Sequence, residues 1–166
     1  MRGDLEIYAT RSEDIDDFYA ALSSVVNEGR FLLMSEPPSL EQVRAFILAN
    51  IENNSAQYVA RIDGRLVGWA DIVPSQRSTM THGARLGMGI VCGHRRQGIG
   101  SALLSTALSH AWQTGLKRIE LEVFADNEVA IHLYKTNGFN IEGTKRFARY
   151  SDEHYQDIVQ MAQYRI

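Results

Sequence analysis

Hydrophobic and polar positions at the start of the chain change from a strand period to a helix period. The segment from Leu5 to Arg11 alternates closely enough to form a strand. Ser12-Glu13-Asp14 then offers an N-cap and an acidic first turn. We therefore expect a helix that runs to about Asn27 and stops at Gly29.

A second helix is expected after Pro37-Pro38. Ser39 and Gln42 form a capping-box pattern, in which each side chain can bind a backbone N–H of the other residue. The apolar residues that follow lie at helical spacing; they are Val43, Phe46, Ile47 and Ile51.

Two strand-like runs come next, over residues 58–62 and 66–70. They are joined at Asp63-Gly64, a pair typical of a tight hairpin turn, so we expect these strands to be antiparallel. Polar residues from Ser75 to His82 then predict a loop.

The second half of the chain alternates strand and helix patterns. A weakly alternating apolar strand is expected over residues 84–92, and a largely buried helix follows it and ends at Gly115. Its apolar residues are Ile99, Ala102, Leu103, Ala107, Leu108, Ala111 and Trp112. A strand over 117–124 precedes a helix over 129–137, and the last strands are expected over 139–141 and 155–166.

This order of elements predicts an α/β fold with a mixed sheet. Strand, helix, strand and helix after residue 84 imply parallel neighbours joined by a crossover helix, whereas the N-terminal half contains an antiparallel hairpin. The 166 residues lie in the usual range for one domain, and no repeat or long linker interrupts them. We expect a single domain over residues 1–166.

Composition excludes several classes of protein. A net charge of −3 disfavours nucleic-acid binding. Cys92 is the single cysteine, and no histidine spacing completes a zinc site with it, so neither a disulfide nor a metal is expected. The N-terminus lacks a secretory signal pattern, and no apolar run approaches the ~18 residues of a membrane span. We expect a cytoplasmic protein without a membrane partner.

A basic, glycine-punctuated turn links the strand over 84–92 to the following helix. Gly98 and Gly100 let a ligand approach the main chain, and the first helical turn supplies free N–H donors and the positive end of a dipole. Arg95 and Arg96 add positive charge. The turn is typical of a phosphate site. The alternative is that its glycines only separate the strand from the helix and that its arginines are ordinary surface charges. It matches neither a dinucleotide fingerprint nor a P-loop.

A second set of residues lies along one later helix. Asn127, Ala130 and Tyr134 are spaced i, i+3 and i+7, so they form a stripe about 10 Å long, which is roughly the reach of a pantetheine arm. The alternative is that Asn127 caps the helix and Tyr134 packs in the core.

Together the two motifs resemble those of the GCN5-related N-acetyltransferases. They are Arg95-x-x-Gly98-x-Gly100 and the segment from Leu121-Glu122-Val123 through Asn127, Ala130 and Leu133-Tyr134 to Gly138-Phe139. Phe139-x-x-Glu142-Gly143 and Asp63-Gly64-x-x-Val67-Gly68 are similar to the subgroup that acetylates free amino acids. The resemblance implies a mixed, mostly antiparallel sheet of six to seven strands, with a splayed parallel pair at its centre and about four flanking helices.

The resemblance also implies a bound acetyl-CoA as the acetyl donor. Its pantetheine arm would pair with the backbone of Met88, Gly89 and Ile90, as a strand added to an open edge does. Asn127, Ala130 and Tyr134 would line the arm. The diphosphate would contact the amides of Arg96, Gln97, Gly98, Ile99, Gly100 and Ser101, and Arg95 or Arg96 would add charge-assisted contacts.

In the mechanism of this family an amine attacks the thioester directly. Tyr134 matches the position of the acid that protonates the leaving thiolate. Glu122 is the candidate base, because strand alternation places it with Glu120 on the face opposite the aliphatic residues. It can equally be a solvated strand glutamate. His82 is an alternative base, and Cys92 is expected to pack rather than act as a nucleophile.

We therefore expect acetyl transfer to a primary amine of a small molecule, such as a free amino acid. Two alternatives stay open: a protein N-terminal acetyltransferase of the ribosomal-protein-alanine kind, and a non-catalytic acyl-CoA sensor. The acceptor pocket is expected to draw on residues 31–38, 75–82 and 145–155. A homodimer through edge strands or the tail is a further expectation.

Overall fold

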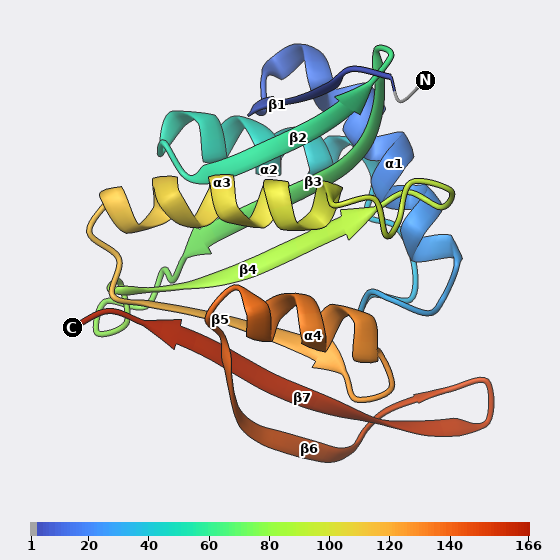
Figure 1. Ribbon diagram of the computed structural model, residues 1–166, viewed down its shortest axis with the longest axis vertical. Coiled ribbons are helices and arrows are strands. Elements are labelled where there is room, and N and C mark those ends of the chain that lie inside the picture. The colour runs from blue at the N-terminus through green and yellow to red at the C-terminus, as the bar shows by residue number, and fades with distance from the viewer. Residues whose placement is uncertain (1–2) are drawn as a thin grey trace.

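The computed structural model describes residues 3–166, which contain seven strands and four α-helices (Figure 1). In chain order these are β1 (Leu5–Ala9), α1 (Ile15–Asn27), α2 (Leu40–Glu52), β2 (Ala56–Ile62), β3 (Arg65–Pro74), β4 (Gly83–Ile90), α3 (Ile99–Gln113), β5 (Arg118–Phe124), α4 (Glu128–Thr136), β6 (Asn140–Ser151) and β7 (His154–Tyr164). A short 3₁₀ helix, Ser12–Asp14, precedes α1.

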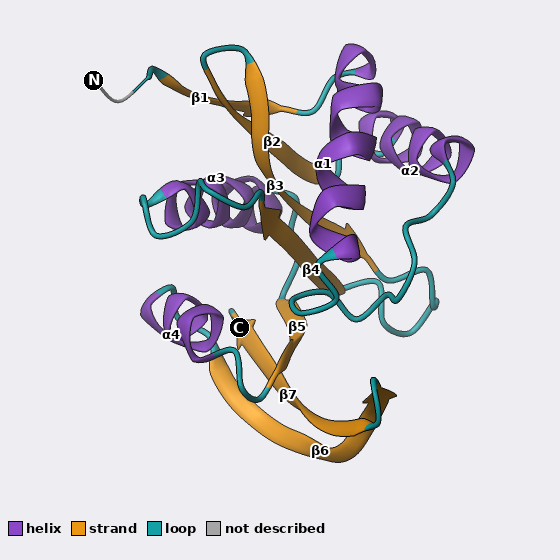
Figure 2. Cartoon of the chain, turned by 90° about the vertical axis from the view of Figure 1, so that its right-hand side faces the viewer, coloured by secondary structure: helices purple, strands orange, loops and turns teal. Residues whose placement is uncertain are grey.

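The strands form one sheet in the order β1-β2-β3-β4-β5-β7-β6. Every neighbouring pair is antiparallel except β4 and β5, which are parallel. Figure 2 shows α3 and α4 on one side of the sheet and α1 and α2 on the other. The predicted mixed, mostly antiparallel sheet with flanking helices is therefore confirmed.

The parallel pair at the centre of the sheet separates soon after it begins. β4 pairs with β5 only at Gly83–Arg118, Ala84–Ile119 and Arg85–Glu120. On its other side β4 stays paired with β3 as far as Ile90. Residues 86–90 of β4 therefore present a strand edge without a β5 partner, and the predicted splayed pair is confirmed.

The first helix begins later than its sequence pattern predicts. β1 ends at Ala9, and the 3₁₀ helix separates it from α1, so Ser12 is not the N-cap of the long helix. The physical reason is the buried Asp14, whose carboxylate accepts hydrogen bonds from the Arg11 amide (2.9 Å) and the Tyr8 hydroxyl (2.8 Å). These bonds hold the chain in a tight turn before the helix starts.

The predicted hairpin between β2 and β3 is confirmed. Asp63 and Gly64 have φ angles of 49° and 77°, the two positive values of a type I′ turn. A second turn of this kind, at Asp152 and Glu153 (φ 51° and 62°), joins β6 to β7 without any glycine.

The prediction of a strand over residues 139–141 is wrong in its length, because β6 runs from Asn140 to Ser151. β6 is the outermost strand and most of its residues are exposed. An edge strand exposed in this way has no buried face, so its sequence shows no alternation that would reveal its length. The β6–β7 hairpin curves toward the side of the sheet covered by α1 and α2 (Figure 2).

Two hydrophobic clusters hold these layers together. One packs α3 against the sheet around Leu103, Leu104 and Met161, and the other packs α1 and α2 around Phe18, Ile47 and Trp69. Among residues 3–166, no helix is long and apolar enough to cross a membrane.

Candidate active site

The turn between β4 and α3 has the backbone geometry of an anion site. Gly93, Arg96 and Gly98 have positive φ angles of 87°, 60° and 83°, and Gly98 is the left-handed N-cap of α3. Within the described chain, no backbone or side-chain acceptor is found for the amides of residues 95–98. The amides of 99–101 belong to the first helical turn, where helix geometry provides no partner. Consecutive free N–H groups at a helix N-terminus favour a phosphate.

Gly100 lies at the boundary between α3, β4 and α4. A Cβ built on it would meet Leu133 at 3.4 Å, Met88 at 3.6 Å and Ile90 at 3.9 Å. The side chains of Met88, Ile90 and Leu133 therefore converge on the first turn of α3, and the predicted donor-binding elements are brought together here.

The open edge of β4 exposes the backbone of alternate residues. The Val91 amide donates to the Val67 carbonyl (2.8 Å), and antiparallel pairing alternates from there, so the polar groups of Gly89 face β3. Those of Met88 and Ile90 then face the unpaired side. Of the three residues predicted to pair with a pantetheine arm, Met88 and Ile90 have the required orientation and Gly89 does not.

Arg95 is already engaged within the protein. Its guanidinium makes two hydrogen bonds to the Glu28 carboxylate, donates from Nε to the Ile90 carbonyl (2.9 Å) and lies 4.2 Å from the centre of the Phe31 ring. Hydrogen bonds from Arg95 hold the pKa of Glu28 below its usual range. The prediction that Arg95 adds a contact to the diphosphate does not match this geometry; Arg95 instead ties the turn to the end of α1.

Replacement of Arg95 by alanine is expected to destabilise the fold by about 1–3 kcal/mol, because a paired carboxylate and a stacked ring lose their partner. Thermal unfolding should show a decrease in Tm of several degrees. The matched control is Arg96→Ala, which removes an exposed side chain. Equal decreases for the two variants would contradict the structural role of Arg95.

The other residues of the turn that are predicted to bind the diphosphate differ in how far they are exposed to solvent. Arg96, Gln97 and Ser101 are exposed, and Gln97 donates through its side chain to the Gly93 carbonyl (3.1 Å). Ile99 is 2% exposed and packs in the core, so it can offer a ligand only its amide. Arg96 is therefore the cation of this turn that the structure leaves at the surface.

The three residues of the predicted stripe on α4 have different surroundings in the structure. Asn127 is the N-cap of α4, and its side-chain oxygen accepts from the Ala130 amide (3.2 Å), as in the capping alternative. Ala130 is half-buried against the core. Tyr134 is 9% exposed and stacks edge-on with Phe139, with 5.9 Å between ring centroids.

The surroundings of Tyr134 keep its phenol protonated. Burial raises the pKa of Tyr134 to about 12. Its hydroxyl has no hydrogen-bond partner among the described residues, and it stays accessible to solvent. A neutral phenol with a free hydroxyl can donate a proton to an anion that forms beside it.

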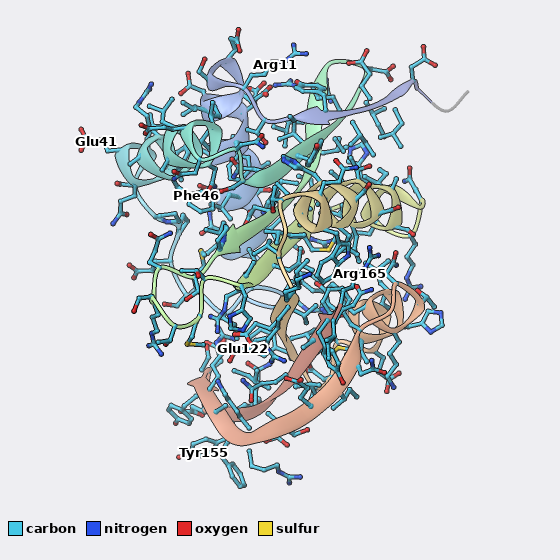
Figure 3. All side chains as sticks on the ribbon, turned by 90° about the vertical axis from the view of Figure 1, so that its left-hand side faces the viewer. Arg11, Glu41, Phe46, Glu122, Tyr155 and Arg165 are labelled. Atoms are coloured by element: carbon cyan, nitrogen blue, oxygen red, sulfur yellow. The ribbon has the colours of Figure 1, made fainter. Side chains whose placement is uncertain are left out.

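Glu122 lies on the opposite face of the sheet from Tyr134. Its side chain is 11% exposed, forms an ion pair with Lys145 of β6, and lies 3.9 Å from Arg85 of β4. Figure 3 shows it on the side of the sheet that carries α1 and α2. The two predicted catalytic residues therefore flank the splay from opposite faces, and Glu122 already has a cationic partner.

His82 and Cys92 lie at opposite ends of β4. His82 is exposed beside the short paired section, where its carbonyl accepts from the Lys117 amide (2.8 Å). Cys92 is exposed in the turn that follows the strand, not packed as predicted. Among residues 3–166, no group of three His, Cys, Asp or Glu side chains could hold a metal ion.

The structure adds residues that sequence reasoning missed. Asp71 and Trp69 of β3 pair with Gly87 and Gly89 of β4, and both side chains lie over these glycines. A Cβ on Gly89 would come within 2.4 Å of the Trp69 ring. The alternating glycines of Leu-Gly-Met-Gly-Ile were the available signal, because a strand keeps glycine where another side chain covers it.

Comparisons with known proteins agree with this fold. The family model for the acetyltransferase (GNAT) family matches residues 19–139. The L-amino acid N-acetyltransferase AaaT of Escherichia coli is 40% identical over 109 residues, which are 64% of this chain and 66% of that protein, slightly less than two thirds of its length.

Solved structures give the same result. A GNAT-family acetyltransferase from Streptococcus pneumoniae has a TM-score of 0.89 and 27% identity, over 97% of this chain and 99% of that one. The yncA protein of Salmonella typhimurium, solved with its cofactor acetyl-CoA, has a TM-score of 0.91 and 15% identity, over 96% and 93%. The fold is thus the one that these acetyltransferases share. The chain belongs to the GNAT acetyltransferase family.

Proposed function

We propose that this enzyme transfers acetyl from acetyl-CoA to the primary amine of a small molecule, with free L-amino acids as the favoured class. The observation that carries the proposal is the splay, where an open strand edge and a row of free amides meet beside a neutral phenol. The name of the Escherichia coli relative supports the amino-acid class.

The donor substrate fits the groups on the α3 and α4 side. The amides of residues 96–101 would hold the diphosphate, and Arg96 can reach it from the surface. The backbone of Met88 and the amide of Ile90 would pair with the pantetheine arm, because these groups face the unpaired side; the Ile90 carbonyl already accepts from Arg95. Ala130 and Tyr134 would line the arm from α4, while Asn127 caps that helix.

Tyr134 would act at the reactive end of the arm. The amine forms a bond to the thioester carbon, the carbon–sulfur bond breaks, and the electron pair leaves on sulfur. Tyr134 can supply the proton that this thiolate requires, since its own pKa keeps the phenol neutral at working pH. The amine must approach from the face with Glu122 and Arg85, because α3 and α4 cover the other face.

Arg85 is the group that suits the carboxylate of an amino acid. Its side chain is 61% exposed, and its nearest anion is Glu122 at 3.9 Å, too long for a hydrogen bond. Arg85→Ala is expected to raise KM for free amino acids about 10-fold, the cost of one charge-assisted contact, and to leave KM unchanged for amines without a carboxylate. Initial rates over both substrate classes measure this.

The matched control for that prediction is Arg44→Ala, which removes an exposed arginine on α2. An equal increase in KM for amines with and without a carboxylate would show that Arg85 does not bind the acceptor carboxylate.

Thiol release from acetyl-CoA across a panel of acceptors tests the proposed function. Free amino acids are expected to give a higher kcat/KM than peptides that begin with alanine. The reverse order would instead support the N-terminal acetyltransferase. Tight binding of acetyl-CoA with no turnover of any amine would support the non-catalytic sensor.

A further inference from the structure

Asp71 is a carboxylate without a partner on the acceptor side of the sheet. It is half-buried on β3, and among the described residues no donor or cation binds its side chain. It lies on the same face as Trp69, which packs against α1, so it faces the side opposite α3 and α4. A half-buried carboxylate that has no partner in the protein is available to bind a cationic ligand.

The residues paired with Asp71 on both neighbouring strands leave its carboxylate without a partner. On β4 its register partner is Gly87, where a Cβ would come within 3.2 Å of the Asp71 Oδ1 atom. On β2 its partner is Gln57, which is 3% exposed and whose side-chain nitrogen and oxygen both lack a hydrogen-bond partner. An unpartnered carboxylate and an unpartnered buried amide thus lie side by side on this face of the sheet.

Asp71 is also placed at the reactive end of the donor site. Gly87 adjoins Met88 and lies within the part of β4 that has no β5 partner. A pantetheine arm that runs from the amides of α3 along Ile90 and Met88 ends beside Gly87. The register partner of Gly87 therefore flanks the position of the thioester, on the face from which the amine arrives.

We propose that Asp71 binds the ammonium group of the acceptor and takes a proton from it. This inference rests on the proposed acetyl transfer. It assigns to Asp71 the role that the sequence suggested for Glu122, whose carboxylate is paired with Lys145.

The protons and electrons of the step balance as follows. One ammonium proton passes to the Asp71 carboxylate and then to solvent, which frees the nitrogen lone pair. That pair forms the bond to the thioester carbon, and the carbon–sulfur bond breaks onto sulfur, which takes the Tyr134 proton. The adduct nitrogen loses a second proton, which returns to Tyr134 through water. The products are the amide, the free thiol and one proton.

The electrostatic surroundings suit this role. Burial raises the pKa of Asp71 to about 7, with no contribution from a charged neighbour. On the same face, β4 carries Arg85, β5 carries Glu120 and Glu122, and β2 carries the neutral Gln57. Within Ile15–Asn27 and Leu40–Glu52, the buried side chains are not ionisable; they are Ile15, Phe18, Ala21, Leu22, Val25, Val26, Val43, Ile47 and Asn50.

The test is the pH profile of kcat/KM for a free amino acid in the wild type, Asp71→Asn and Asp71→Glu. The wild type is expected to lose activity as pH falls through about 7, where Asp71 becomes protonated. Asp71→Asn should lower kcat/KM about 100-fold and remove this acidic limb, with Kd for acetyl-CoA unchanged. Asp71→Glu, which keeps a carboxylate, should restore part of the rate together with an acidic limb.

The matched control is Asp63→Asn in the β2–β3 turn, where the side chain is exposed and asparagine accepts the positive φ. An unaltered profile in Asp71→Asn would overturn the role of Asp71 while acetyl transfer stands. If Asp71→Asn does not fold, loss of the acidic limb in a folded Asp71→Glu would also overturn it. A wild type that acetylates no amine would overturn the proposed function, and this inference with it.

Discussion

Replacement of Tyr134 by phenylalanine is expected to lower kcat about 100-fold or more. The substitution removes only the hydroxyl, so the stacking with Phe139 and the packing of α4 should persist. Since burial keeps the phenol neutral, its loss removes a proton donor at every accessible pH. Steady-state rates with saturating acetyl-CoA measure the effect, and a binding titration should show an unchanged Kd for acetyl-CoA.

The control for this prediction is Tyr164→Phe, which removes the hydroxyl of an exposed tyrosine at the end of β7. It should leave kcat unchanged. A Tyr134→Phe enzyme with the wild-type rate would exclude Tyr134 as the acid. A weakened Kd with an unchanged kcat would instead show that the hydroxyl contributes to donor binding.

Replacement of Asp14 by asparagine is expected to destabilise the protein by about 3–5 kcal/mol, because Arg61 then loses its buried anion and keeps only the exposed Asp17. Asp14 is 3% exposed, and its carboxylate contacts Arg61 at 2.8 Å and the Tyr8 hydroxyl at 2.8 Å. In thermal unfolding this corresponds to a decrease in Tm of about 10 °C. Asp17→Asn removes an exposed contact of the same arginine and should cost less than about 1 kcal/mol.

The pH dependence of this effect has a definite sign. Burial by itself would raise the pKa of Asp14, but hydrogen bonds from Arg61, the Arg11 amide and Tyr8 outweigh it and hold that pKa below the ordinary 3.8. A lowered pKa means that Asp14 contributes stability above the unfolded-state value, and that this contribution is lost as pH falls through the folded-state value. The gap in stability between wild type and Asp14→Asn should therefore narrow below about pH 4. A constant gap down to pH 2 would contradict this account.

The parts of the fold that follow from local chemistry could be predicted from the sequence. Asp63-Gly64 predicted a tight hairpin turn, because few other residue pairs adopt the two positive φ angles that are found there. Ser39 and Gln42 predicted the start of α2, and both capping hydrogen bonds are present. The parallel pair followed from the strand and helix order after residue 84, since such strands need a crossover.

The role of Arg95 could not be predicted, because its partner Glu28 is 67 residues away and belongs to a different layer. An arginine beside a glycine-rich turn looks like a phosphate ligand until the end of α1 is placed next to it. The same applies to Glu122, whose partner Lys145 comes from an edge strand that the sequence does not delimit.

Asp71 illustrates a further limit of sequence reasoning. Its residue type and position within β3 carry no signal, since the significance of Asp71 depends on the register that sets it opposite Gly87 and beside Gln57. The glycines of β4 indicate that something covers them, but only the pairing identifies what does.

Acetyl transfer to a free amino acid is tested most directly by a product assay. The purified protein is incubated with acetyl-CoA and a mixture of L-amino acids, and mass spectrometry identifies the acetylated products while thiol titration measures released CoA. The expected result is an N-acetyl amino acid formed in the same amount as free thiol, and its loss in Tyr134→Phe. Bound acetyl-CoA without any acetylated amino acid would contradict the proposed function.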